Sequence, residues 1–259
     1  DYKRNAYGVA YIHENETIKL GNSSGWYAGA VNNTFKFKDI GKSKENVTMV
    51  KAGLYKTKAF DNNGSLQWTI SGEAFASRSA MERKYLVVDE IFKAKSDYNT
   101  YGVAVKNEIS KEFRTGERFS IRPYGSLKLE YGKFGDIKEK SGEMRLEVKG
   151  NDYISVKPEV GMEFKYKRAV GRYGTFSTTL GLGYENELGK VDNVKNKARV
   201  ANTNAEWFGI RSEKDDRKGN FKADLTIGID NSKFGVTVNG GYDTKGKNVR
   251  GGIGFKFMY

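Results

Sequence analysis

The chain has 259 residues, among them 31 Gly, 16 Tyr and 15 Phe but only 2 Pro and no Cys. No run of about 18 apolar residues occurs, which excludes a transmembrane helix, and the lack of Cys excludes a disulfide framework and a Cys-ligated metal. The formal charge of +13 suggests a nucleic-acid partner. The basic residues, however, are scattered along the chain near Asp or Glu, so we expect no nucleic-acid partner.

The first half of the chain contains five segments in which apolar and polar residues alternate, weakly in places. An alternation of period two is typical of a β-strand with one apolar face. The segments are Tyr7 to Tyr11, Tyr27 to Phe37, Val50 to Leu54, Leu66 to Ala76 and Tyr101 to Ile109.

The second half alternates more regularly. Its segments are Phe119 to Tyr131, Val156 to Tyr166, Phe176 to Tyr184, Phe221 to Ile229 and Phe234 to Tyr242. The last two are joined by a tight polar turn around Asn231, which predicts a hairpin. With no helical period of comparable length and no linker, the pattern predicts a single all-β domain over residues 1–259.

Each strand of this kind has an apolar and a polar face. On the apolar face we predict these lipid-facing residues: Leu127, Leu129, Leu180, Leu182, Leu225, Ile227, Val236 and Val238. On the polar face we predict these lumen-lining residues: Arg122, Lys128, Glu130, Lys157, Glu159, Glu163, Lys165, Glu185, Lys222 and Asp224. A soluble sandwich would turn the polar face to bulk water and a barrel would enclose it, and periodicity alone does not choose between them.

Strand length and aromatic placement favour a membrane barrel. Many segments have ten or more residues, whereas strands of soluble proteins average five or six, and about ten tilted residues cross a bilayer. Aromatic residues end several apolar rows, as at Phe119 and Tyr131 or Phe234 and Tyr242. Such ends are typical of the two aromatic girdles at membrane interfaces.

Connection lengths point the same way. One set is short, around Asn231 and at Ala169 to Arg172, Arg114 to Gly116, and Asp61 to Gly64. The alternate set contains three long stretches: Leu188 to Lys218, Lys133 to Asn151, and Ser79 to Lys95. Two further members, Thr244 to Lys247 and Ile40 to Glu45, are short exceptions. Short turns on one side and long loops on the other are the bacterial outer-membrane pattern, which predicts a periplasmic C-terminus.

The chain closes with GGIGFKFMY, in which Ile253, Phe255, Phe257 and Tyr259 share one face. This ending is similar to the C-terminal strand of bacterial outer-membrane proteins, which is read as an assembly signal by the insertion machinery. The stretches SIRPYGSLKLEYGKFGD and FGVTVNGGYDTKGKNVRGGIGFKFMY further resemble the β-domain, or translocator, of classical monomeric (type Va) autotransporters.

The resemblance implies a closed antiparallel transmembrane β-barrel of about 12 strands in the bacterial outer membrane. Its function would be to anchor an N-terminal passenger and support the export of that passenger to the cell surface. Implied partners are outer-membrane lipid and lipopolysaccharide, the passenger with its linker helix, the assembly machinery and periplasmic chaperones, and we expect a monomer. The sequence shows about eleven strands and neither passenger nor lumen helix. The remaining strand would lie before Asp1 or in the less regular stretch Val200 to Ser212, which could equally be a surface loop.

We expect no enzymatic activity, catalytic residue, metal site or cofactor. His13 is the only histidine, so no triad or His-ligated metal site can form around a cluster, and we interpret it as an interface or turn residue. Glu159 and Glu163 lie too far apart on one strand face to share a proton, which indicates a structural charge ladder. Two alternatives stay open: an outer-membrane pore, which would carry open current in a bilayer, and a soluble basic binding module, which would be extracted without detergent.

Overall fold

The computed structural model describes residues 2–15, 17, 19–142, 144–191, 195–211, 219–231, 233–245 and 247–257. In this part of the chain no helix is long and apolar enough to cross a membrane. The regular elements there are strands: β1 (Tyr2–Asn15), β2 (Ser23–Phe37), β3 (Lys44–Ala59), β4 (Leu66–Val87), β5 (Glu90–Lys111), β6 (Phe113–Arg114), β7 (Phe119–Phe134), β8 (Ile137–Ser141), β9 (Leu146–Val148), β10 (Asp152–Val170), β11 (Gly174–Asn186), β12 (Lys195–Val200), β13 (Phe208–Arg211), β14 (Gly219–Asp230), β15 (Phe234–Asp243) and β16 (Asn248–Phe257).

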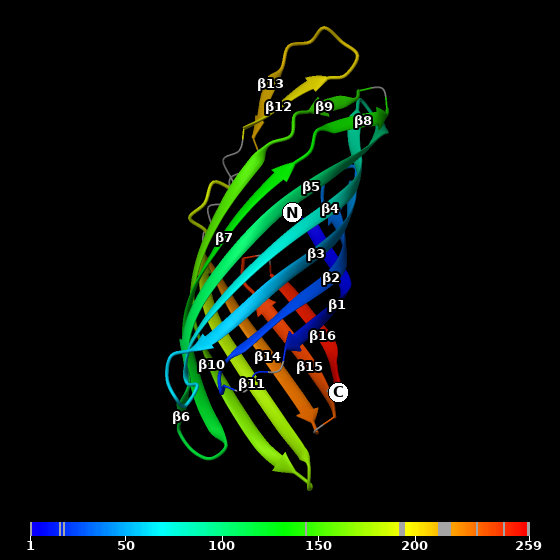
Figure 1. Cartoon of the computed structure of the whole chain (residues 1–259). Helices are drawn as coiled ribbons and strands as arrows, with labels where there is room; N and C mark the ends of the chain where they lie inside the picture. The colour runs from blue at the N-terminus through cyan, green and yellow to red at the C-terminus, as the bar shows by residue number, and fades with distance from the viewer. Residues whose placement is uncertain are drawn as a thin grey trace.

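Eleven of the described strands form the wall of a barrel (Figure 1). Their order is β1-β2-β3-β4-β5-β7-β10-β11-β14-β15-β16, which is also their order in the chain. All neighbours in this order pair antiparallel. The prediction of an all-β antiparallel barrel is confirmed, with eleven wall strands and five short additional ones beside the predicted number of about 12.

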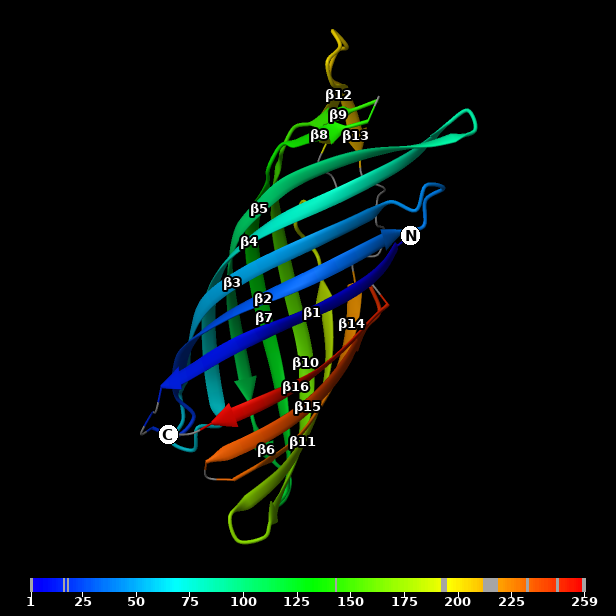
Figure 2. The same cartoon turned by 90° about the vertical axis from the view of Figure 1, so that its right-hand side faces the viewer.

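The two end strands of the wall, β1 and β16, run in the same direction. This follows from the antiparallel order, because the first and eleventh strands of an alternating series are parallel. Figure 2 shows both strands descending towards the end of the barrel at which the chain finishes. No described residue of β1 pairs with one of β16, so the barrel is closed except for a seam between these parallel edges.

The register gives the wall two chemically different faces. Lys128 lies opposite Lys157 on β7 and β10, and Leu129 lies opposite Val156. Hydrogen bonds that skip a strand identify the concave face, since only curvature brings such side chains together. Tyr27 of β2, for example, donates to Glu73 of β4 across β3. The charged residues therefore lie inside the barrel and the apolar ones outside.

The protein has no conventional hydrophobic core in the part that the structure describes. The buried hydrophobic side chains there are Ala59, Ala94, Ala104 and Ala198, and none of the large side chains is fully buried. Apolar side chains on the outer face are instead exposed, such as Val160 at 64% and Ile253 at 68%. A soluble domain of this length buries its large apolar side chains, so the outer face is suited to an apolar surrounding.

Aromatic rings lie over glycines of the next strand on the inner face. A Cβ added to Gly161 would lie 2.5 Å from Cζ of Tyr124, and one added to Gly132 would lie 2.3 Å from Cε1 of Tyr153. The absence of a side chain at these glycines lets the rings lie flat against the wall. The tyrosine rings therefore lie along the wall and leave the middle of the barrel interior unoccupied by these rings.

The connections differ in length between the two ends of the barrel. At the end where β16 finishes, residues 60–65 and 171–173 form short turns, and β14 ends at Asp230 only shortly before β15 begins at Phe234. At the other end residues 135–151 contain β8 and β9, and residues 187–218 contain β12 and β13. These four short strands pair as a small sheet above the rim (Figure 1).

One expectation about the long loops needs correction, and one open alternative is decided for the described residues. Ser79 to Lys95 is not a loop, because β4 and β5 stay paired as far as Val87 and Glu90. Val200 to Ser212 does not supply a wall strand either. Its regular part, β13, pairs with β12 above the rim, and Ser212 lies outside the described residues.

Candidate functional site

The inner face carries a first ionic cluster around Glu73 on β4. Lys128 Nζ lies 3.1 Å from a Glu73 carboxylate oxygen and 3.0 Å from one of Glu130. The Tyr27 hydroxyl donates to Glu73 at 2.7 Å, and the Tyr153 hydroxyl donates to Glu130 at 2.8 Å. Each carboxylate therefore has both a cation and a phenol as partners.

A second cluster surrounds Arg122 on β7. Its guanidinium donates to both Glu163 oxygens, at 2.9 and 2.7 Å, and also lies 3.4 Å from Glu108. Lys106 pairs with Glu108 at 2.9 Å and Lys165 with Glu163 at 3.3 Å. A bidentate arginine–carboxylate pair has a fixed geometry, so this cluster stiffens the wall where β5, β7 and β10 meet.

A third cluster joins β10, β11 and β14. Lys222 Nζ lies 2.6 Å from Glu185 and 3.1 Å from Glu159, and the Tyr124 hydroxyl donates to Glu159 at 2.8 Å. Nearer the seam, Arg250 of β16 lies 2.8 Å from Asp224. Charge is thus compensated locally around the inside of the wall.

The structure places all ten predicted lumen-lining residues on this inner face, and each has an ionic partner. Lys157, the loosest, lies 3.9 Å from Glu187. Glu159 and Glu163 belong to different clusters, in keeping with a charge ladder rather than a proton-sharing pair.

Sequence reasoning missed several members of these clusters. Glu73 and Glu108 lie in segments of weak alternation, where the polar face could not be assigned. Arg250 lies one residue before the predicted segment GGIGFKFMY and was therefore not assigned to a face. The inward position of Tyr124 and Tyr153 could have been found from the sequence, because they lie in the same alternating rows as Arg122 and Lys157. Tyr27 could not, because it shares its row with Val31 and Phe35.

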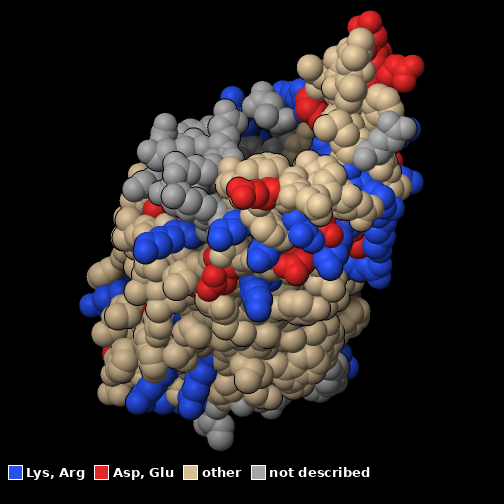
Figure 3. Space-filling view, turned by 90° about the horizontal axis from the view of Figure 1, so that it is seen from above, with Lys and Arg blue, Asp and Glu red and all other residues tan. Residues whose placement is uncertain are grey.

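The outer face holds the predicted lipid-facing residues. Six of the eight, Leu127, Leu129, Leu180, Leu225, Ile227 and Val238, are 39% to 53% exposed, and Leu182 and Val236 are half-buried. Seen from the loop end, charged side chains form a belt near the rim, and the wall visible beyond it is mostly uncharged (Figure 3).

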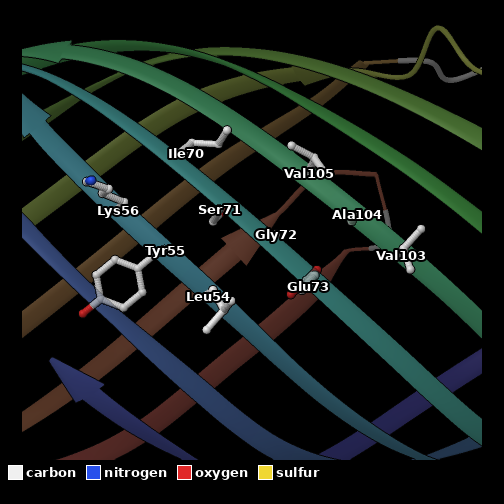
Figure 4. Close-up of a pocket in the computed structure, with 10 residues that line it drawn as sticks. All are labelled: Leu54, Tyr55, Lys56, Ile70, Ser71, Gly72, Glu73, Val103, Ala104 and Val105. Atoms are coloured by element: carbon white, nitrogen blue, oxygen red, sulfur yellow. The ribbon is translucent and has the colours of Figure 1, made fainter.

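Grooves mark the outer face where small residues replace large ones. One of ≈ 540 Å³ lies over β3, β4 and β5. Figure 4 shows Leu54, Val103 and Val105 standing around Gly72, which has no side chain to fill the space.

The last strand presents the residues predicted as an assembly signal. Ile253, Phe255 and Phe257 are 65% to 68% exposed on the outer face. Phe234 of β15 contacts Phe255 and Phe257, with ring centroids 6.4 and 5.3 Å apart. Tyr259, the fourth predicted residue, lies outside the described residues.

The described residues contain no group of three or more His, Cys, Asp and Glu side chains that could hold a metal ion. His13 lies on β1 with its ring 5.9 Å from that of Trp26, on the outer face with the apolar residues.

An antiparallel barrel with an apolar exterior and an ionic interior is the architecture of outer-membrane β-barrels. A family model for the autotransporter β-domain matches residues 1–254, and the chain belongs to this family. It is accordingly an outer-membrane translocator domain that supports passenger export, as the sequence resemblance predicted.

Two solved structures share the fold. The β-domain of the Bordetella autotransporter BrkA is similar with a TM-score of 0.68 and 12% identity, covering 100% of this chain and 92% of that one. The translocator domain of the autotransporter NalP from Neisseria meningitidis is similar with a TM-score of 0.70 and 10% identity, covering 100% and 80%. A comparison with curated protein sequences gives no significant match.

Proposed function

We propose that residues 1–259 form one translocator domain that acts by physical means, without enzymatic chemistry. The observation that supports this is the compensated ionic interior inside an apolar wall. A polypeptide segment held in such an interior meets hydrogen-bonding side chains and buries no apolar surface of the wall. The apolar wall leaves the inserted barrel anchored in the lipid.

We place the short turns and the C-terminus on the periplasmic side, with β8, β9, β12 and β13 at the cell surface. The support is the difference in connection length, since short periplasmic turns and longer surface loops are typical of these barrels. The exposed residues of β16 would be recognised by the assembly machinery and periplasmic chaperones before insertion. Lipid and lipopolysaccharide would cover the outer wall, and the barrel would work as a monomer.

The test is export of a reporter. A protease-sensitive passenger with a linker is fused before Asp1 and produced in a Gram-negative host, and its cleavage is measured in intact cells. We expect the passenger to be cleaved with the full chain and not to be cleaved after deletion of Phe257–Tyr259. The amount of folded barrel is measured separately from its heat-modifiable mobility on gels. A folded, membrane-inserted barrel whose passenger stays protected would contradict the proposed function.

A further inference from the structure

Three lysines stand side by side on the outer face at the loop end of the barrel. Lys3 of β1 lies opposite Lys36 of β2, and Lys36 lies opposite Lys44 of β3. All three are exposed. Neighbouring strands are about 4.8 Å apart, so three positive charges occupy a row of roughly 10 Å, an arrangement that is destabilising when like charges face each other directly.

These lysines have no carboxylate partner among the described residues. The next residue in the row, Glu82, lies opposite Lys44 but pairs with Lys84 at 3.6 Å. The inner face shows how the same wall treats lysines that are compensated, since Lys128 and Lys222 each contact two carboxylates. The described residues therefore supply no anion to this row of lysines, and an anion from outside the chain could bind there.

An apolar groove lies on the same strands, nearer the middle of the wall. It has a volume of ≈ 660 Å³. Its outward residues include Ala28, Ala30, Ala52 and Ala74, bordered by Val9 and Val50. Small side chains between larger ones leave a shallow apolar channel in the outer face, whose chemistry suits hydrocarbon chains.

The spacing between the lysine row and the groove restricts what could occupy both. Val9 follows Lys3 by six positions, and Val50 follows Lys44 by six. This offset is about 20 Å along a strand and roughly 14 Å along the barrel axis at a 45° tilt. Outward polar side chains fill the interval, among them Thr34, which donates to Asn46 at 2.9 Å. A phospholipid carries its phosphate close to its acyl chains, so the interval suits a larger headgroup built of sugars.

We propose that this face binds one molecule of a glycolipid with phosphates on its sugar headgroup, of the lipopolysaccharide type. The phosphates accept hydrogen bonds from Lys3, Lys36 and Lys44, the sugars lie against the polar interval, and acyl chains lie in the alanine groove. A second copy of this chain fits less well, because it would bring a second lysine row rather than an anion. The inference rests on the proposed surface location of the loop end.

The test uses the purified full chain in neutral detergent with a chelator, so that divalent cations cannot bridge anions. Native mass spectrometry measures retention of phosphorylated lipopolysaccharide, of the same glycolipid after enzymatic dephosphorylation, and of phosphatidylglycerol. We expect wild type to prefer the first, and the triple variant K3Q/K36Q/K44Q to lose at least about tenfold in apparent affinity. The variant K3R/K36R/K44R keeps the charges and should retain binding.

The matched control is K56Q/K58Q/K111Q. It removes three exposed lysines of β3 and β5 from the outer face at the other end of the barrel, away from the lysine row. It should bind as wild type does. Equal affinity of wild type and K3Q/K36Q/K44Q, equal loss in both Gln triples, or no effect of dephosphorylation would each overturn the inference. Binding is measured on the isolated barrel and export in cells, so the inference and the proposed function can fail separately.

Discussion

Tyrosine rings packed over glycines make single inner-face positions sensitive to one methyl group. Replacing Gly161 with Ala puts a Cβ 2.5 Å from the Tyr124 ring, which must then move away from Glu159. We expect Gly161→Ala to lower the free energy of unfolding by about 1–3 kcal/mol, as other overpacking changes do. Urea unfolding in micelles measures this loss.

The control for that change is Gly125→Ala, on the outer face of β7. An added Cβ there meets nothing within 4 Å, so the midpoint should stay close to that of wild type. Equal midpoints for both variants would show that the ring does not constrain Gly161.

The turn between β3 and β4 has a titratable hydrogen-bond acceptor. The Ser65 hydroxyl and the backbone N–H of Leu66 donate to the Asp61 carboxylate, and these bonds lower the pKa of Asp61. A carboxyl group with a lowered pKa stabilises the fold at pH values above its ordinary pKa of about 3.9 and stops doing so as the pH falls through its folded value.

We therefore expect Asp61→Asn to lower the thermal midpoint at pH 7 and to have a shrinking effect as the pH falls below about 4. Thermal scans of the variant and wild type between acid and neutral pH measure the difference. Asp89→Asn, in the exposed turn between β4 and β5, is the control for removal of a turn carboxylate and should leave the thermal midpoint at pH 7 close to that of wild type. If the thermal midpoint of Asp61→Asn stayed below that of wild type by the same amount at every pH, the loss would not come from the charge of Asp61.

Residue orientation was predictable wherever one row was purely apolar. Leu225 and Lys222 were assigned to opposite faces because β14 alternates without interruption. Glu73 was not, since the outward neighbours on β4 are Gly72 and Ala74, whose small side chains carry little facing information. Which carboxylate pairs with which lysine depends on strand register, and alternation alone does not fix register.

Within a single wall strand, the face decides whether a charge is tolerated. Leu225 of β14 lies outside, 43% exposed, and Thr226 follows it inside. An outward Arg near the middle of a bilayer costs about 2–4 kcal/mol. We expect Leu225→Arg to block membrane assembly and Thr226→Arg to permit it, measured as the heat-modifiable fraction in outer-membrane preparations. Equal assembly of the two variants would reject the assigned faces.

Strand ends were harder to predict than strand centres, for a physical reason. Beyond a bilayer the outer face of a strand meets water, so the apolar row stops while the hydrogen bonding continues. The upper half of β5 shows this, because the exposed Lys93 and Lys95 alternate there with the small, buried Ala94 and Ser96 rather than with large apolar residues. The pattern in Ser79 to Lys95 therefore looked like a loop although it is a paired hairpin.

The whole barrel has a predicted orientation that insertions can test. The turn Val88–Asp89 lies at the loop end, with Val88 87% exposed, and Arg172–Tyr173 lies at the opposite end, with Tyr173 72% exposed. We expect an epitope inserted after Val88 to be labelled by antibody on intact cells. An epitope after Arg172 should be labelled only after the outer membrane is permeabilised. The reverse labelling result would show that the barrel has the opposite orientation in the membrane.

The strand count shows what sequence could and could not provide at this scale. About eleven alternating segments predicted the eleven wall strands that the structure describes. Whether the two end strands can pair antiparallel depends on whether the number of wall strands is odd or even. Since β1 and β16 are parallel, antiparallel closure requires an additional strand between them. Pairing both edges would remove unsatisfied backbone groups from the lipid.

The wall is also unequal in height. β4 and β5 have 22 residues each, whereas β15 and β16 have 10, so one side stands well above the other (Figure 2). A chain emerging at the rim would be sheltered by backbone along one flank and open to solvent along the other. The exported segment would then have room to fold first on the side of β15 and β16, where the wall is lower.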